Sequence, residues 1–142
     1  MHLQSSSQIR GAPAIASLAA LSLRTHLSTK SFTTPAELSS HIKPILDHLQ
    51  SSRPTAVNLS EALNRLRQIL SEGEKSKDSG DEVKEKVRKA CKAVHGEDLA
   101  RCMEMGKIGA DWLWAKRGGG KKGLKVITVC NTGSLATSVS TC

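Results

Sequence analysis

The turn Cys130-Asn131-Thr132-Gly133 holds the residues best suited to chemistry. It follows a continuous β-branched run, 124–130, and precedes what reads as the start of a helix at Leu135. In an open α/β sheet, ligands bind beyond the carboxyl ends of strands, where helix N-termini direct N–H groups outward. Such a turn can cradle a phosphate, and a helix N-terminus lowers the pKa of a nearby thiol. The turn therefore predicts either a reactive Cys130 beside an anion or a small buried residue that ends a strand.

Two arginines stand at points where the chain is about to enter a helix. In Arg10-Gly11-Ala12-Pro13, Gly11 lets the backbone approach a ligand, and Arg10 offers a planar fork suited to phosphate. In Arg53-Pro54-Thr55, the second arginine lies at a rigid break between two helical patterns. Each segment alone also fits an ordinary helix connection. Together with the turn at 130–133 they favour an anionic ligand, without identifying it.

The charge balance is basic, with 21 Lys and Arg against 13 Asp and Glu and a net charge of +8. Nucleic acids, anionic membranes and phosphate-bearing ligands are the partners that such a balance suggests. Residues 116–125 hold five of the positive charges and read as a solvated loop. Since only 2% of the residues are aromatic, little surface exists for stacking single-stranded nucleic acid. We expect neither nucleic-acid binding nor a membrane span, because no apolar stretch reaches about 18 residues.

The cysteines Cys91, Cys102, Cys130 and Cys142 show neither a CxxC pair nor zinc-ligand spacing. Cys91 and His95 are one helical turn apart, but no second close pair completes a metal site. We therefore expect no metal site here, and we expect Cys91 and Cys102 to be small buried thiols in a reducing compartment.

The first 36 residues contain no Asp or Glu and are rich in Ser, a composition typical of a mitochondrial transit peptide. The run from Ala12 to Leu23 also fits the apolar part of a secretory signal. A buried helix explains the same run, because Pro13 is favoured in a first helical turn and the residues after it are apolar nearly all round.

The remaining pattern predicts a mainly α fold. A capping box, Thr34 to Glu37, begins a helix that runs to about Ser52, with a kink at Pro44. Apolar residues at helical spacing predict a third helix over 56–71, closed by Gly73. We assign 1–72 to a helical N-terminal region and 73–80 to a flexible polar loop.

A long helical stretch over 81–117, capped by Asp81, should be interrupted at Gly96, Gly106 and Gly109. Its charged early half reads as a solvated face, and its apolar late half should pack. Residues 118–142 begin an α/β domain, because 124–130 reads as a buried parallel strand. A lone parallel strand cannot form a sheet, so we expect this α/β domain to be truncated.

Three strings give this chain a family resemblance: IRGAPAIASLAALSL (9–23), SSRPTAVNLSEAL (51–63) and KVITVCNTGSLAT (125–137). Together they resemble the 5-methylthioribose-1-phosphate isomerases, aldose–ketose isomerases of methionine salvage. This family is related to the regulatory subunits of the translation-initiation guanine-nucleotide exchange factor. The resemblance implies that Arg10, Gly11 and Ala12 bind phosphate, that Arg53 is a second substrate arginine, and that Cys130 is catalytic. It also places Asn131, Thr132 and Gly133 at the substrate.

The resemblance further implies isomerisation of 5-methylthioribose 1-phosphate without metal or cofactor, in a homodimer of the cytoplasm, with the nucleus as a second location. The helix after Pro13 is a core helix in that family, so it needs no targeting signal. After Thr137 the family continues through a Rossmann-like domain, so the resemblance implies that residues 118–142 are the start of a truncated Rossmann-like domain. This chain departs from the family at that point, and the family's proton-donating aspartate has no counterpart. We therefore expect a chain truncated at both ends and inactive alone. A non-catalytic interaction protein, related to the exchange-factor subunits, is the alternative.

Overall fold

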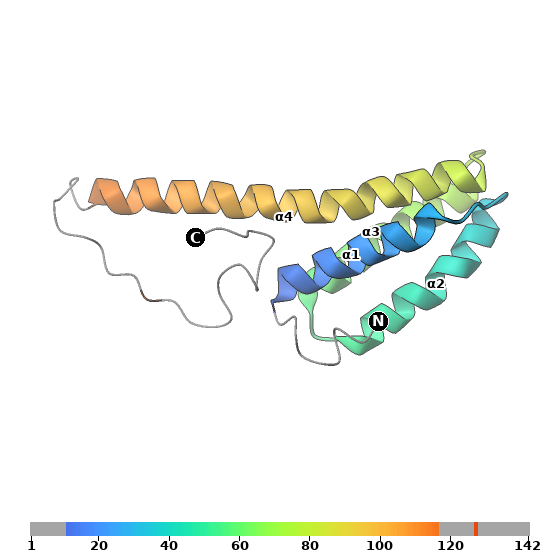
Figure 1. Ribbon diagram of the computed structural model, residues 1–142, viewed down its shortest axis with the longest axis horizontal. Coiled ribbons are helices and arrows are strands. Elements are labelled where there is room, and N and C mark those ends of the chain that lie inside the picture. The colour runs from blue at the N-terminus through green and yellow to red at the C-terminus, as the bar shows by residue number, and fades with distance from the viewer. Residues whose placement is uncertain (1–10, 117–126, 128–142) are drawn as a thin grey trace.

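The structure is a computed structural model that describes residues 11–116 together with Ile127. Within 11–116 it contains four helices: α1 (Ala12–Ser28), α2 (Pro35–Ser52), α3 (Val57–Lys75) and α4 (Gly80–Lys116). The helices run alternately up and down, and α1 and α3 pack against each other and against α4 (Figure 1). α2 packs on α3 and α4. Among the described residues, the second half of α4 continues beyond the other three helices (Figure 1). The prediction of a mainly α fold is confirmed for the described residues.

Local sequence signals explain where the first two helices begin. Pro13 lies in the first turn of α1, where its missing N–H costs nothing. At α2, Thr34 caps the helix by accepting a hydrogen bond from the Glu37 N–H (3.2 Å), and the Glu37 carboxylate accepts one from the Thr33 N–H (3.0 Å). The predicted capping box is thus confirmed. α2 runs through Pro44 to Ser52 as one helix.

The core lies between the helices and consists almost wholly of aliphatic side chains, as the scarcity of aromatic residues requires. Phe32, in the connection between α1 and α2, is its aromatic member. Burial of these side chains is the main force that holds the helices together, at about 25 cal/mol for each Å² of apolar surface removed from water. The largest fully buried side chains are Ile15, Leu27, Leu38, Ile42, Leu46, Leu49, Leu59, Leu66, Leu70, Val83, Val87 and Cys91.

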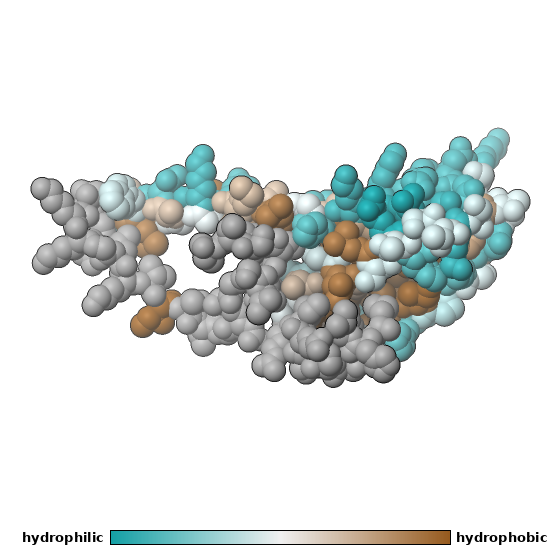
Figure 2. Space-filling model, in the orientation of Figure 1, coloured by the Kyte–Doolittle hydropathy of each residue, from teal (hydrophilic) through white to brown (hydrophobic). Residues whose placement is uncertain are grey.

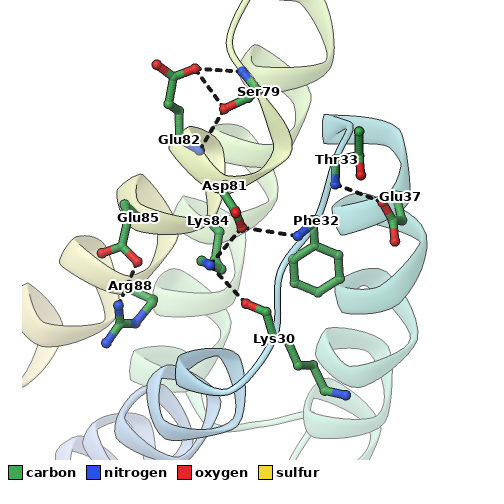
Figure 3. A network of polar contacts seen from close by, with 10 residues as sticks. All are labelled: Lys30, Phe32, Thr33, Glu37, Ser79, Asp81, Glu82, Lys84, Glu85 and Arg88. Carbon is green, nitrogen blue, oxygen red and sulfur yellow. Dashed lines mark hydrogen bonds and ion pairs between the residues drawn. The ribbon is translucent and has the colours of Figure 1, made fainter.

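The boundaries around the polar connection before α4 differ from the prediction. α3 runs past Gly73 to Lys75, so the predicted loop over 73–80 shrinks to 76–79. The cap of α4 is Ser79 rather than Asp81. The Ser79 hydroxyl accepts from the Glu82 N–H (3.3 Å), and the Glu82 carboxylate accepts from the Ser79 N–H (2.7 Å) (Figure 3). These two bonds form a second capping box, which was not predicted from the sequence.

Asp81 has another role, which is to hold the connection between α1 and α2 against the start of α4. Its carboxylate accepts a hydrogen bond from the Phe32 N–H (3.1 Å) and one from the Lys84 ammonium (2.7 Å). Lys84 is largely buried and also donates to the Lys30 carbonyl (2.9 Å) (Figure 3). These charge-assisted bonds satisfy an ammonium that would otherwise be costly to bury.

The predicted interruptions of the last helix at three glycines are wrong, because α4 is continuous from Gly80 to Lys116. A glycine inside a helix costs roughly 1 kcal/mol relative to alanine. Three such residues spread over 37 positions do not outweigh the helix formers between them. A glycine in such a pattern weakens a helix without ending it.

The two halves of α4 also exchange their predicted roles. The charged early half packs, because Val83, Val87 and Cys91 recur at i, i+4 and i+8 and form one buried stripe. The apolar late half does not pack within the described residues. Its side chains Met103, Met105, Ile108, Trp112 and Trp114 are between 59% and 65% exposed. Figure 2 shows apolar side chains along this projecting half of the helix.

The strand predicted over 124–130 lies outside the described residues, except for Ile127. That residue is in neither a helix nor a strand and is 97% exposed. The truncated α/β domain therefore stays a prediction. Among the described helices, none combines the length and the apolar character that crossing a bilayer requires.

Candidate functional site

Two helix N-termini, those of α1 and α3, lie at the same end of the bundle (Figure 1). Pro13 in the first turn of α1 and Asn58 in the first turn of α3 line one cleft. Neither N-cap residue, Gly11 or Ala56, has a side chain that accepts a hydrogen bond from the first turn of its helix. Neither first turn contains an acidic residue. First-turn N–H groups, which have no partner within their own helix, and the positive ends of two helix dipoles therefore meet at this end, which favours an anion.

Three predicted site residues are among those that the structure describes: Gly11, Ala12 and Arg53. Gly11 is buried, and its carbonyl accepts the first hydrogen bond of α1, from the Ile15 N–H (2.9 Å). Its φ of −73° is ordinary extended backbone. Ala12 is the first residue of the helix and is half-buried. Both therefore stand where a ligand at the N-terminus of α1 would lie.

Arg53 is half-buried and follows α2 directly, in the turn that leads into α3. Its φ of −147° and ψ of 70° lie outside the helical region, which a residue before proline avoids. Its carbonyl accepts a hydrogen bond from the Ala56 N–H (3.1 Å), which fixes the turn. The predicted break between the two helices is therefore confirmed. Arg10, Cys130, Asn131, Thr132 and Gly133 lie outside the described residues, so their placement stays a prediction.

The cleft between the two N-termini and the middle of α4 has a volume of about 80 Å³. Binding sites for drug-sized ligands usually occupy roughly 300–1,000 Å³. The cleft by itself therefore has room for one group of a sugar phosphate and not for a whole substrate. It is lined by Pro13, Ala16, Ser17, Asn58, Glu61, Ala62, Arg65, Val94, Glu97, Asp98 and Arg101.

Charged side chains of both signs surround this cleft. The Arg65 guanidinium donates to both carboxylate oxygens of Glu97 at 3.0 Å, which joins α3 to α4 at the rim. Both side chains are nearly half exposed, so solvent screens the pair and its contribution to stability is small. Asp98 is only 7% exposed, and Arg101 lies one helical turn further along α4. Any ligand group that enters must match this mixed lining.

Sequence reasoning missed these lining residues, although a signal for them existed. Helical spacing within α3 puts Asn58, Glu61 and Arg65 on one face of that helix. Glu97 and Arg101 show the same spacing on α4. The pattern alone cannot tell that the two polar faces meet, because that depends on how α3 packs against α4.

The thiols of the long helix are unsuited to nucleophilic chemistry. Cys91 is fully buried, and desolvation raises the pKa of its thiol to about 12. Cys102 is half-exposed, so the prediction that it is buried is wrong; its part of α4 projects beyond the bundle. Neither forms a disulfide. No group of three or more His, Cys, Asp or Glu in the described part of the chain is arranged to hold a metal ion, and Cys91 with His95 forms none.

Comparison with known proteins agrees with the resemblance. Residues 8–141 match the sequence profile of the Initiation factor 2 subunit family. A protein of Cryptococcus neoformans named methylthioribose-1-phosphate isomerase is 56% identical over 136 residues. Proteins with the same name are 44% identical over 143 residues in Laccaria bicolor and 40% identical over 131 residues in Hordeum vulgare. Each alignment covers 92% of this chain.

The chain spans about a third of the length of these relatives. It corresponds to 35% of the proteins from Cryptococcus neoformans and Hordeum vulgare and to 37% of the one from Laccaria bicolor. The matched part includes the N-terminus of α1, the turn at Arg53 and the segment that contains Cys130.

Proposed function

Because this chain belongs to the Initiation factor 2 subunit family, we propose that it supplies the phosphate-binding part of a methylthioribose-1-phosphate isomerase. The reaction converts 5-methylthioribose 1-phosphate into 5-methylthioribulose 1-phosphate. One observation carries the proposal: two helix N-termini without side-chain caps meet at one cleft, and the predicted phosphate-binding residues Gly11 and Ala12 stand at one of them. The names of the relatives support the same substrate.

Arg10, Gly11, Ala12 and Arg53 bind the phosphate in this proposal. The backbone N–H groups at the start of α1 meet the anion, and the positive end of the helix dipole favours its charge. Each arginine adds charge-assisted hydrogen bonds, which a guanidinium can direct at two oxygens of one phosphate. Arg53 suits this role because the turn before α3 holds its backbone in place.

Cys130 is the catalytic residue in this proposal, and Asn131, Thr132 and Gly133 form the turn that holds the substrate beside it. A phosphate on the anomeric carbon prevents simple ring opening to a free aldehyde. The reaction therefore needs a sheltered site in which an acid and a closely placed thiol act on the sugar. A thiol at a helix N-terminus is suited to this work because its ionised form is stabilised there.

A chimera tests the proposal. Residues 8–137 of this chain would replace the matched segment of the relative from Cryptococcus neoformans, and turnover of 5-methylthioribose 1-phosphate would be measured. We expect the chimera to be active, with Arg10→Ala and Arg53→Ala raising KM by about tenfold or more, in line with lost charge-assisted contacts. Arg67→Ala is the matched control, because Arg67 pairs with Asp47 on the outer surface. An inactive chimera that is folded would overturn the proposal.

The 142-residue chain alone should bind phosphate weakly and should not turn over the substrate. General acid–base assistance is typically worth about 10²–10⁴-fold in rate. The resemblance implies that the family's proton-donating aspartate lies beyond the 35% of the Cryptococcus neoformans relative that this chain matches. We propose the homodimer and the cytoplasm, with the nucleus as a second location, as properties of the isomerase.

A non-catalytic interaction protein is the second candidate. The exposed apolar side chains of α4, from Met103 to Trp114, favour it because such surface usually contacts other protein. The same chimera separates the two functions. An active chimera whose Cys130→Ser variant is inactive supports the isomerase, and an inactive chimera supports the interaction protein.

A further inference from the structure

α1 and α2 follow each other in the chain and yet barely touch, because both pack mainly on α3 and α4. Between them lies a groove of about 210 Å³, lined by Ala19, Ser22, Leu23, His26, Ile45 and Leu49. Figure 2 shows apolar surface in this region, between the helices labelled α1 and α2 in Figure 1.

One side-chain pair bridges the groove. His26, in the last turn of α1, and His41, one turn before Ile45 on α2, bring their Nε2 atoms to 2.9 Å. The two ring planes differ by 2°, and the ring centroids are 5.1 Å apart. The centroid separation exceeds the Nε2–Nε2 distance by about the width of one imidazole ring. The two nitrogens therefore lie on the line between the centroids, and the rings are coplanar and head to head.

This geometry suits one shared proton. One ring donates through Nε2–H and the other accepts through its Nε2 lone pair, so the hydrogen bond is nearly linear. A metal ion does not fit between the two nitrogens, because zinc requires about 2.0–2.1 Å to each of them. A neutral pair and a singly protonated pair both keep the bond. A doubly protonated pair places two N–H donors and two positive charges against each other.

The surroundings oppose the second proton. Burial lowers the pKa of His41, and the charges of Lys30 and His26 lower it further. The Phe32 ring lies against His41, with centroids 5.4 Å apart. Two charged groups of the surrounding elements already have partners. The Glu37 carboxylate on α2 accepts a hydrogen bond from the Thr33 N–H, and the Lys84 ammonium on α4 donates to Asp81 and to the Lys30 carbonyl.

We propose that His26 and His41 form a single-proton latch between α1 and α2, which closes at neutral pH and opens when both rings are protonated. Opening separates the two helices at this end and widens the apolar groove. The latch rests on the geometry of the bundle and is independent of the isomerase assignment.

The first test is the titration of the histidine rings in the full 142-residue chain by NMR. We expect the ring nitrogens of His26 and His41 to show scalar coupling through the hydrogen bond at about pH 7.5, and to lose it at about pH 5. The chemical shifts of the two rings should change with pH in coupled steps, because the two groups interact directly. Independent titration of His26 and His41, without coupling, would overturn the proposal.

The second test compares urea midpoints at the same two pH values. We expect the wild-type midpoint to fall on acidification, and the fall to be at least halved in His41→Gln, which cannot take up a second proton. His48→Gln is the matched control and should keep the full wild-type fall. An equal fall in His41→Gln and His48→Gln would overturn the latch. If His41→Gln does not fold, the NMR titration of the wild-type chain decides alone.

Discussion

Gly80 and Phe32 meet backbone to backbone, because a Cβ on Gly80 would lie 2.5 Å from the Phe32 carbonyl oxygen. The Gly80 N–H donates to the neighbouring Thr33 carbonyl at 3.1 Å. The contact joins the connection between α1 and α2 to the first residue of α4. Only a residue without a side chain permits this approach.

Gly80→Ala should therefore destabilise the bundle by about 2 kcal/mol or more, since backbone atoms cannot yield as a flexible side chain can. Urea unfolding measures the change. Gly96→Ala is the control on the same helix, because nothing lies within 4 Å of its Cβ position. It should stabilise the chain by roughly 0.5–1 kcal/mol through helix propensity. Equal stability of Gly80→Ala and wild type would contradict the close approach.

The polar network around Asp81 should make stability depend on acid. Hydrogen bonds from Lys84 and from the Phe32 N–H lower the pKa of Asp81 below its ordinary value of 3.8. In the folded state Asp81 thus binds its proton at lower pH than in the unfolded state. Its stabilisation is present above pH 3.8 and is lost as the pH falls through the folded pKa.

Asp81→Asn should reduce this loss below pH 4, as measured by thermal unfolding across the acid range. The histidine latch affects stability at higher pH than Asp81 does, because the pKa of His41 is lowered from 6.5. Its contribution is present above pH 6.5 and declines as the pH falls toward the folded pKa of His41. An Asp81→Asn profile that matches wild type below pH 4 would show that the carboxylate contributes nothing there.

The thiols of α4 should differ in reactivity. We expect iodoacetamide at about pH 8 to modify Cys102, while Cys91 stays unmodified until the chain unfolds, since a thiol reacts through its thiolate. Peptide mass spectrometry identifies the modified residues, and the same reaction in urea is the control. In the active chimera, Cys91→Ser should leave kcat nearly unchanged and Cys130→Ser should remove most of it. Fast labelling of folded Cys91 would be inconsistent with its burial.

The two halves of α4 should respond differently to the loss of a side chain. Val87→Ala creates a cavity in the core and should cost about 2 kcal/mol. Ile108→Ala removes a larger side chain from an exposed position and should change stability by about 0.5 kcal/mol or less. Chemical unfolding of both variants tests the contrast. A large cost at Ile108 would mean that the late half of α4 packs in solution.

The first three helices could be predicted because their signals are local. Proline at the start of α1, the capping box at Thr34 and apolar residues at helical spacing each act within one or two turns. The packed and exposed halves of α4 could not be predicted correctly, since the half that packs depends on where the other helices end. The Ser79 cap shows a different limit: its capping box is local, but Asp81 offered a competing cap two residues later.

The candidate site was predicted in part. Gly11 and Arg53 were found through motifs, and the structure places both at helix boundaries beside the cleft end of the bundle. The facing residues Arg65 and Glu97 are 32 positions apart, so their pairing follows from tertiary packing alone. The bond between His26 and His41 likewise joins two helices, and no local pattern announces it.

The continuity of α4 has a mechanical consequence. At 1.5 Å per residue its 37 residues extend over roughly 55 Å, and its buried residues end at Asp98. The remainder is an arm of about 27 Å, which within residues 11–116 is anchored through the bundle. A rotation of about 5° at the bundle would carry Lys116 sideways by roughly 2 Å. The packing around the last buried residue of α4, Asp98, therefore sets the direction in which the far end of the helix points.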